Sequence, residues 1–172
     1  VHVHPGAEEL GRVYQVDLLI NSGMPEFASA LVNMPPVDAT AWKGLVEHAH
    51  AADQAERTPT PTSDQLDMAQ VVLQLQARLG KDVIVTNGAG NYSGWAHRYW
   101  RYGGFRSQLG PTSGAMGYGL PAAVAAKLQA PDRTVVCFAG DGCFLMSGQE
   151  LATARQYGAR ILVLVVNQDR IS

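Results

Sequence analysis

Three short apolar runs, rich in β-branched residues, constrain the fold of this chain most strongly. They cover residues 83–85, 134–139 and 161–166, and none of them alternates regularly with polar residues. Strands of this kind are buried on both faces, as in a parallel sheet that is covered by helices. Helical segments separate the runs, so the sequence predicts an α/β fold, a parallel sheet flanked by helices and built from right-handed strand–helix–strand units.

The segments around these runs predict the helices and a boundary. Thr62 and Gln65 have the spacing of a capping box at the start of one helix, and Gly80 is a suitable residue for its end. The polar connector at residues 58–62 alternates threonine with proline and predicts a domain boundary. A short strand is expected at residues 1–3. One helix is predicted to begin near Pro25. Further helices are predicted over residues 38–57, 64–79, 114–129 and 147–157, and Asp38 is the expected N-cap of the first of these four.

The composition argues against two classes of partner. A formal net charge of -2 provides no positive field for nucleic acid. We therefore read residues 97–106, where basic and aromatic residues alternate, as a loop at a subunit interface or at the rim of the active site. No apolar run reaches the roughly 20 residues of a membrane-spanning helix, so no membrane partner is expected.

Cys137 and Cys143 have neither disulfide nor zinc spacing, which favours a reducing, cytoplasmic location.

Small and polar residues follow the apolar runs, where parallel sheets bind their ligands. Gly140-Asp141-Gly142 ends the second run, and Asn167 follows the third run, 26 residues after Asp141. One strand–helix–strand excursion returns the chain to the same edge in about that length. Although Asp-Gly alone is typical of an ordinary turn, we expect the Asp141 carboxylate and the Asn167 amide to converge. Such oxygens suit Mg²⁺ or Ca²⁺, and the glycine-rich amides suit a diphosphate.

These motifs resemble those of the thiamine diphosphate-dependent enzymes, in particular the acetolactate synthase-like group. The resemblance depends on Gly140-Asp141-Gly142 with Asn167 at the next strand end, on residues 150–153 and on residues 113–123. It implies that residues 64–172 are the cofactor-binding domain, truncated at its C-terminal side. Residues 1–32 would be the end of a central α/β domain, and residues 33–63 a linker with a helix. Both ends of the chain are abrupt, so we expect a piece of a longer protein.

The resemblance also implies a set of metal ligands. Asp141 would bind Mg²⁺ through its carboxylate, and Arg170 through its backbone carbonyl. The family places a pair of asparagines at the position of Asn167 and Gln168, and its metal ligand is the second of the pair. Here that second residue is Gln168, whose amide is one methylene further from the backbone. Because Mg²⁺ tolerates geometric error poorly, which of the two residues binds the metal stays open.

The same resemblance implies the residues that hold the cofactor. Gly142 and Cys143 would offer backbone amides to the diphosphate, and Asn91 and Tyr92 stand where the family has a Gln-His pair. Met116 would be the bulky apolar residue that folds the cofactor, and it is the one residue of this chain expected to act in catalysis. The expected cofactor-binding residues are Gly88, Asn91, Tyr92, Gly114, Met116, Gly140, Asp141, Gly142 and Cys143.

The implied activity is decarboxylation of a 2-keto acid and transfer to an acceptor carbonyl. A 2-keto acid decarboxylase, another acyl-transfer relative and a non-catalytic cofactor-binding fragment are the alternatives. The family takes a catalytic glutamate from a separate pyrimidine-binding domain, usually of a neighbouring subunit, which implies a homo-oligomer of at least two copies. This chain does not contain that domain and would be incomplete alone. His4 stands where flavin-binding members have acidic residues, which argues against FAD.

Overall fold

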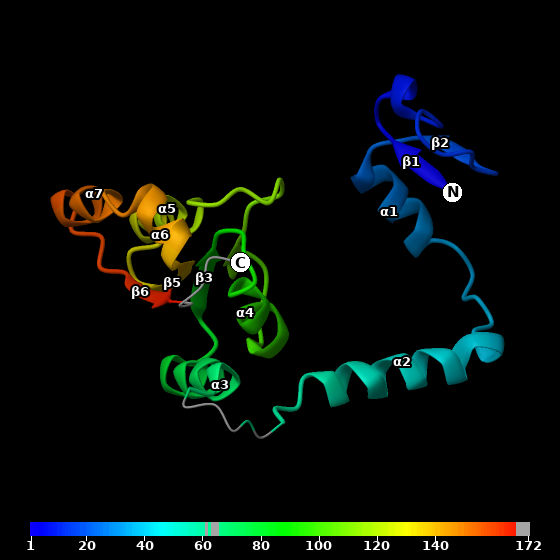
Figure 1. Cartoon of the computed structure of the whole chain (residues 1–172). Coiled ribbons are helices and arrows are strands. Elements are labelled where there is room, and N and C mark those ends of the chain that lie inside the picture. The colour runs from blue at the N-terminus through cyan, green and yellow to red at the C-terminus, as the bar shows by residue number, and fades with distance from the viewer. Residues whose placement is uncertain (61, 63–65, 168–172) are drawn as a thin grey trace. The chain divides into compact units, whose positions relative to one another are not determined.

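The chain forms two compact units, Val1–Ala49 and a second unit that begins at His50 (Figure 1). The computed structural model describes residues 1–60, 62 and 66–167. In the first unit, two short strands pair in parallel, and Pro25 lies in the first turn of the helix that follows them, as predicted. The elements of this unit are β1 (His2–His4), η1 (Ala7–Glu9), β2 (Leu19–Asn21), α1 (Met24–Val32) and η2 (Thr40–Trp42).

The helix α2 (Lys43–Glu56) starts later than its sequence predicts. The Asp38 carboxylate accepts hydrogen bonds from the backbone N–H and the hydroxyl of Thr40. These bonds stabilise the short 3₁₀ turn η2 and do not cap α2, so the predicted N-cap role of Asp38 is wrong. None of the residues of α2 is buried.

The second unit contains a four-stranded, all-parallel sheet with the strand order β4-β3-β5-β6. This confirms the predicted α/β architecture. The helices on the two sides of the strands can be followed in Figure 1. The elements are α3 (Met68–Leu79), β3 (Val83–Asn87), α4 (Ser93–Tyr99), β4 (Gln108–Leu109), α5 (Gly119–Gln129), β5 (Thr134–Gly140), α6 (Asp141–Ser147), α7 (Glu150–Gln156) and β6 (Leu162–Val166).

The central strand β5 separates two apolar cores. Its side chains alternate between the faces of the sheet. Val136 and Phe138 pack with α3 and α4, and the Trp100 ring meets that of Phe138 edge to face. Val135 and Cys137 pack with α5 on the other side. The sheet is therefore buried on both faces, which is why its strands lack polar alternation. Every helix among the described residues is too short or too polar to cross a bilayer.

Two more predicted helix starts are wrong. The helix α3 begins at Met68 instead of residue 64, because the Asp67 side chain caps it by accepting the Gln70 N–H. The predicted capping box therefore does not start it, and Gln65 lies outside the described residues. The helix α5 begins at Gly119 instead of residue 114, because Gly114 and Gly117 have φ values of 68° and 78°, which a right-handed helix does not accept.

The helix predicted at 147–157 corresponds to α7, which begins at Glu150, and the helix α6 that precedes it, ending at Ser147, is not predicted from the sequence. The predicted loop at 97–106 is also partly wrong, because residues 97–99 form the last turn of α4. The three-part division of the chain at residues 32 and 63 stays a prediction.

Candidate cofactor and metal site

Asp141 and Asn167 leave the sheet at the same edge and from neighbouring strands. Gly140, the last residue of β5, is the register partner of Val166, the last residue of β6. Asp141 and Asn167 are the next residues of the two strands. Asp141 is partly buried and Asn167 is exposed. The sheet topology therefore places Asp141 and Asn167 at the ends of neighbouring strands on one edge, and the convergence of their side-chain oxygens stays a prediction.

Asp141 is also the first residue of α6, with Gly140 as its N-cap. The N–H groups of the first helical turn have no acceptor within their own helix, and no side chain caps this end. Such groups carry partial positive charge and favour anions. Among the described residues, no hydrogen bond or ion pair engages the Asp141 carboxylate. One short segment thus offers a free carboxylate beside free backbone donors.

Met116 reaches this segment from the loop before α5. A Cβ atom added to Gly142 would lie 3.1 Å from Met116 Cε, so a glycine at position 142 permits the contact. The same loop packs on α6 at a second point, because a Cβ on Gly117 would lie 3.1 Å from Met146 Cβ. The Met116 side chain is 48% exposed. An apolar side chain therefore lies against Gly142, the residue after Asp141, and remains accessible.

Tyr92 and Cys143 connect the turn after β3 with α6. The Tyr92 hydroxyl accepts the Gly88 N–H at 2.9 Å and donates to Cys143 Sγ at 3.2 Å. The Cys143 thiol donates to the Ala89 carbonyl at 3.1 Å. Both side chains are buried, and burial, with the Cys143 bond, raises the pKa of the Tyr92 phenol above its usual range. Their polar groups thus face one another inside the protein.

The other predicted site residues divide into two groups. Asn91 and Gly114 are exposed, and Gly88 and Gly140 are buried beneath the edge. Gln168 and Arg170 lie outside the described residues. The structure thus places the glycine turns and Asp141 at one edge, while it leaves the predicted roles of all these residues as predictions.

Asn87 belongs to the same edge and is not among the site residues predicted from the sequence. It is the last residue of β3 and only 2% exposed. Its Nδ2 donates to the Gly88 carbonyl at 2.8 Å, and its Oδ1 lies 3.4 Å from both His97 Nε2 and Gln108 Nε2. A polar residue between a buried apolar strand and a glycine turn is the signal that could have identified it.

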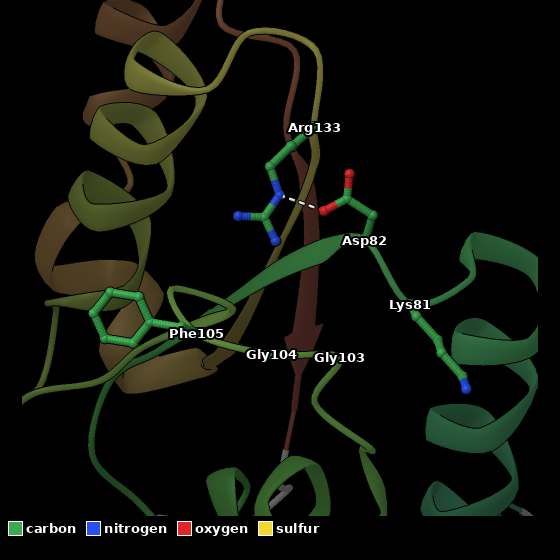
Figure 2. Close-up of a pocket in the computed structure, with 6 residues that line it drawn as sticks. All are labelled: Lys81, Asp82, Gly103, Gly104, Phe105 and Arg133. Carbon is green, nitrogen blue, oxygen red and sulfur yellow. Dashed lines mark ion pairs between the residues drawn. The ribbon is translucent and has the colours of Figure 1, made fainter.

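A pocket of about 330 Å³ lies at the opposite edge of the sheet, beside the first residues of β3 and β5 (Figure 2). Arg133 Nε lies 2.7 Å from Asp82 Oδ1, in an ion pair without hydrogen-bond geometry, and Arg133 Nη1 donates to the Arg106 carbonyl. Figure 2 shows the Lys81 side chain pointing away from Arg133. The guanidinium is thus already engaged by the protein, and this pocket provides no site comparable to the Asp141 edge.

A family model described as "Thiamine pyrophosphate enzyme, C-terminal TPP binding domain" matches residues 88–171. This span contains Gly88, Met116, Asp141 and Asn167, which the structure places on the loops and strand ends of one sheet. This part of the chain belongs to the thiamine pyrophosphate enzyme family. Thiamine pyrophosphate is thiamine diphosphate, so the match confirms the resemblance that the sequence motifs indicate.

Several relatives of this thiamine pyrophosphate enzyme domain are acetolactate synthases. The chain is 31% identical over 171 residues to the acetolactate synthase large subunit of Lactococcus lactis, covering 96% of this chain and 29% of that protein. It is 30% identical to the acetolactate synthase isozyme 1 large subunit of Escherichia coli, covering 99% of this chain and 30% of that protein. The chain therefore spans about 30% of the length of these relatives.

A solved structure agrees with the α/β fold. The thiamine diphosphate-dependent 4-hydroxybenzoylformate decarboxylase of Rhodococcus jostii RHA1 superposes with a TM-score of 0.70 at 25% identity. The match covers 96% of this chain and 30% of the decarboxylase chain. The sequence relatives and the structural relative of this domain thus carry different named activities.

The residues at the edge suit the cofactor and a metal. The donor set combines one carboxylate with amide and backbone groups, and Mg²⁺ takes one or two protein carboxylates and completes its shell with phosphate and water. No group of three or more His, Cys, Asp or Glu side chains in the described part of the chain could hold a metal ion. The fit therefore depends on Asp141 together with oxygens that a ligand diphosphate supplies.

Proposed function

We propose that the chain is the diphosphate- and Mg²⁺-binding part of a thiamine diphosphate-dependent, acetolactate synthase-like enzyme that acts on 2-keto acids by decarboxylation and carboligation. The observation that carries the proposal is the pairing of Gly140 with Val166, which sets Asp141 beside Asn167 at the carboxyl edge. When bound, the cofactor supplies the electron sink for decarboxylation. The chain supplies the binding and orientation of that cofactor.

Each part of the edge has a role in this proposal. The Asp141 carboxylate binds Mg²⁺ with Asn167 or Gln168 and the Arg170 carbonyl. The first-turn amides of α6, at Gly142 and Cys143, hold the diphosphate. Met116 packs against the rings of the cofactor and fixes its folded shape, with Gly114 beside it.

The proposal includes an oligomer of at least two copies, in which a pyrimidine-binding domain outside this chain completes the site. Large apolar side chains near the edge support this assembly, because Met116, Leu145 and Met146 are exposed. Two buried free thiols, Cys137 and Cys143, agree with a reducing compartment such as the cytoplasm.

A 2-keto acid decarboxylase is the second candidate. The specific observation in its favour is the structural similarity to a 4-hydroxybenzoylformate decarboxylase. Analysis of the products formed from pyruvate by the full protein, with thiamine diphosphate and Mg²⁺, distinguishes the two. A carbon–carbon ligated product supports the synthase, and an aldehyde supports the decarboxylase.

Binding tests the part of the proposal that this chain carries. Calorimetric titration of the full protein with thiamine diphosphate is expected to show binding that requires Mg²⁺. Equal affinity with and without Mg²⁺ would contradict the metal site. Binding without turnover of any 2-keto acid would favour the third possibility, a non-catalytic cofactor-binding module.

A further inference from the structure

Tyr92 and Cys143 close a ring of hydrogen bonds that begins and ends in one turn. The ring runs from the Gly88 N–H to the Tyr92 hydroxyl, on to Cys143 Sγ, and back to the Ala89 carbonyl. The Tyr92 hydroxyl and Cys143 Sγ each accept one hydrogen bond and donate the next, and their side chains are at most 5% exposed. The ring therefore links the turn after β3 to the first turn of α6 through buried polar groups.

The Tyr92 side chain also lies directly against the backbone of both strand ends. A Cβ on Gly88 would lie 2.9 Å from both the Tyr92 hydroxyl and Cys143 Sγ. A Cβ on Gly140 would lie 2.8 Å from Tyr92 Cδ1. A side chain at either glycine would collide with Tyr92, so the two glycines allow its ring to lie directly against the turn after β3 and the end of β5. The aromatic ring thus sets the spacing of the two turns.

We propose that Tyr92 and Cys143 are positioning residues for the cofactor site, an inference that rests on the proposed function. Tyr92 does not touch the diphosphate, because its hydroxyl is buried and already has two partners. It acts through the backbone. With Cys143 it holds the first turn of α6, whose amides and Asp141 carboxylate face the ligand, at a fixed position relative to Gly88.

The chemistry of a buried ring explains why the pair acts as a unit. Removal of the Tyr92 hydroxyl leaves the Gly88 N–H without its acceptor, and Cys143 Sγ without its donor. Buried polar groups that lose their partners are costly, and the turns shift to recover hydrogen bonds. Removal of the Cys143 thiol has the same consequence from the other end. The two losses are therefore expected to overlap instead of adding.

Four variants of the full protein test this inference, with thiamine diphosphate and Mg²⁺ as the probe. Tyr92→Phe and Cys143→Ala are expected to raise the Kd for thiamine diphosphate about ten-fold, measured well below their melting temperatures. The double variant is expected to match the single ones. Cys143→Ser keeps a hydroxyl that can donate and accept, so its Kd is expected to stay within about three-fold of wild type.

Two controls separate positioning from stability. Tyr102→Phe removes a buried hydroxyl that has no hydrogen-bond partner among the described residues, from a side chain packed on the same core, and is expected to leave the Kd unchanged. Val72→Ala opens a cavity in that core at α3 and is expected to lower the melting temperature but not the affinity. The inference is overturned if folded Tyr92→Phe has the same Kd as wild type. It is also overturned if Val72→Ala raises the Kd as much as Tyr92→Phe does when the two variants have equal melting temperatures.

Failure of the inference is distinguishable from failure of the proposed function. If wild type shows no Mg²⁺-dependent binding, or if Asp141→Ala binds as wild type does, the proposed cofactor site is wrong. Should wild type bind and Asp141→Ala fail, while Tyr92→Phe binds normally, only the positioning role is wrong.

Discussion

Gly140 and Val166 are register partners at the last position of two neighbouring parallel strands. Asp141 and Asn167 directly follow these two residues, so both lie at the carboxyl edge of the sheet. The start of α6 at Asp141 then turns the backbone so that its first amides point out of the same edge. In the proposed site, the metal and the diphosphate would bind adjacent groups of one short segment.

Replacement of Asp141 should separate metal binding from folding. Because no hydrogen bond or ion pair among the described residues engages its carboxylate, Asp141→Ala is expected to change the free energy of unfolding by less than about 0.5 kcal/mol. It is expected to abolish the Mg²⁺-dependent part of thiamine diphosphate binding, measured by calorimetry. Asp132→Asn, at the opposite edge, is the matched control and should bind as wild type does.

Gly140 and Gly94 should respond in opposite ways to the same added methyl group. A Cβ on Gly140 meets the Tyr92 ring at 2.8 Å, so Gly140→Ala is expected to destabilise the protein by about 1–3 kcal/mol. Gly94 lies in α4, where a Cβ meets no atom within 4 Å. Gly94→Ala is therefore expected to stabilise by about 0.5–1 kcal/mol, through the better helix propensity of alanine. Urea unfolding measures both, and equal losses would refute the packing argument.

Met116 should influence the reaction more than stability. Its half-exposed side chain contributes little to the core, so Met116→Ala is expected to cost less than about 1 kcal/mol of unfolding free energy. Since Met116 is proposed to hold the cofactor rings, the expected effect is a fall in kcat for pyruvate of about ten-fold or more. Met116→Leu keeps the apolar volume and should retain most of the activity. Unchanged kcat in Met116→Ala would remove Met116 from the catalytic site.

The sheet was predictable from sequence because its three longest strands are continuous apolar runs. The edge position of Asp141 and Asn167 followed from the same runs and from the length of the chain between them. The start of α6 was missed because Gly140-Asp141-Gly142 is equally typical of a turn. Here Gly140 has an ordinary extended conformation, with φ of -71° and ψ of 160°, so the residue acts as an N-cap and not as a turn glycine.

Short elements and paired side chains were beyond a reading of the sequence. The strand β4 has two residues, too few to show any periodicity. Tyr92 resembles a cofactor-contacting residue by position, while its buried partner Cys143 is 51 residues away. Nothing local signals that contact, because it joins the turn after β3 to the first turn of α6 across a long stretch of chain.

Buried phenols and thiols should make the protein lose stability at alkaline pH. Burial raises the pKa of Cys137 from its ordinary value of 9.0 to about 11, although a hydrogen bond with Thr86 opposes the shift. Between these values the unfolded chain releases the thiol proton and the folded chain keeps it. Stability from this group is therefore complete below about pH 9 and is lost as pH rises toward 11.

Denaturant unfolding at pH 8, 9, 10 and 11 should measure this loss of stability. We expect a decline that approaches about 1.4 kcal/mol per pH unit for each such group. The ordinary pKa of Tyr102 is 10.0 and burial raises it to about 12, so its contribution is lost between these values and begins at a higher pH than that of Cys137. Cys137→Ala lowers stability at every pH but should flatten the slope between pH 9 and 10. An identical slope in wild type and Cys137→Ala would show that this thiol does not govern the alkaline loss.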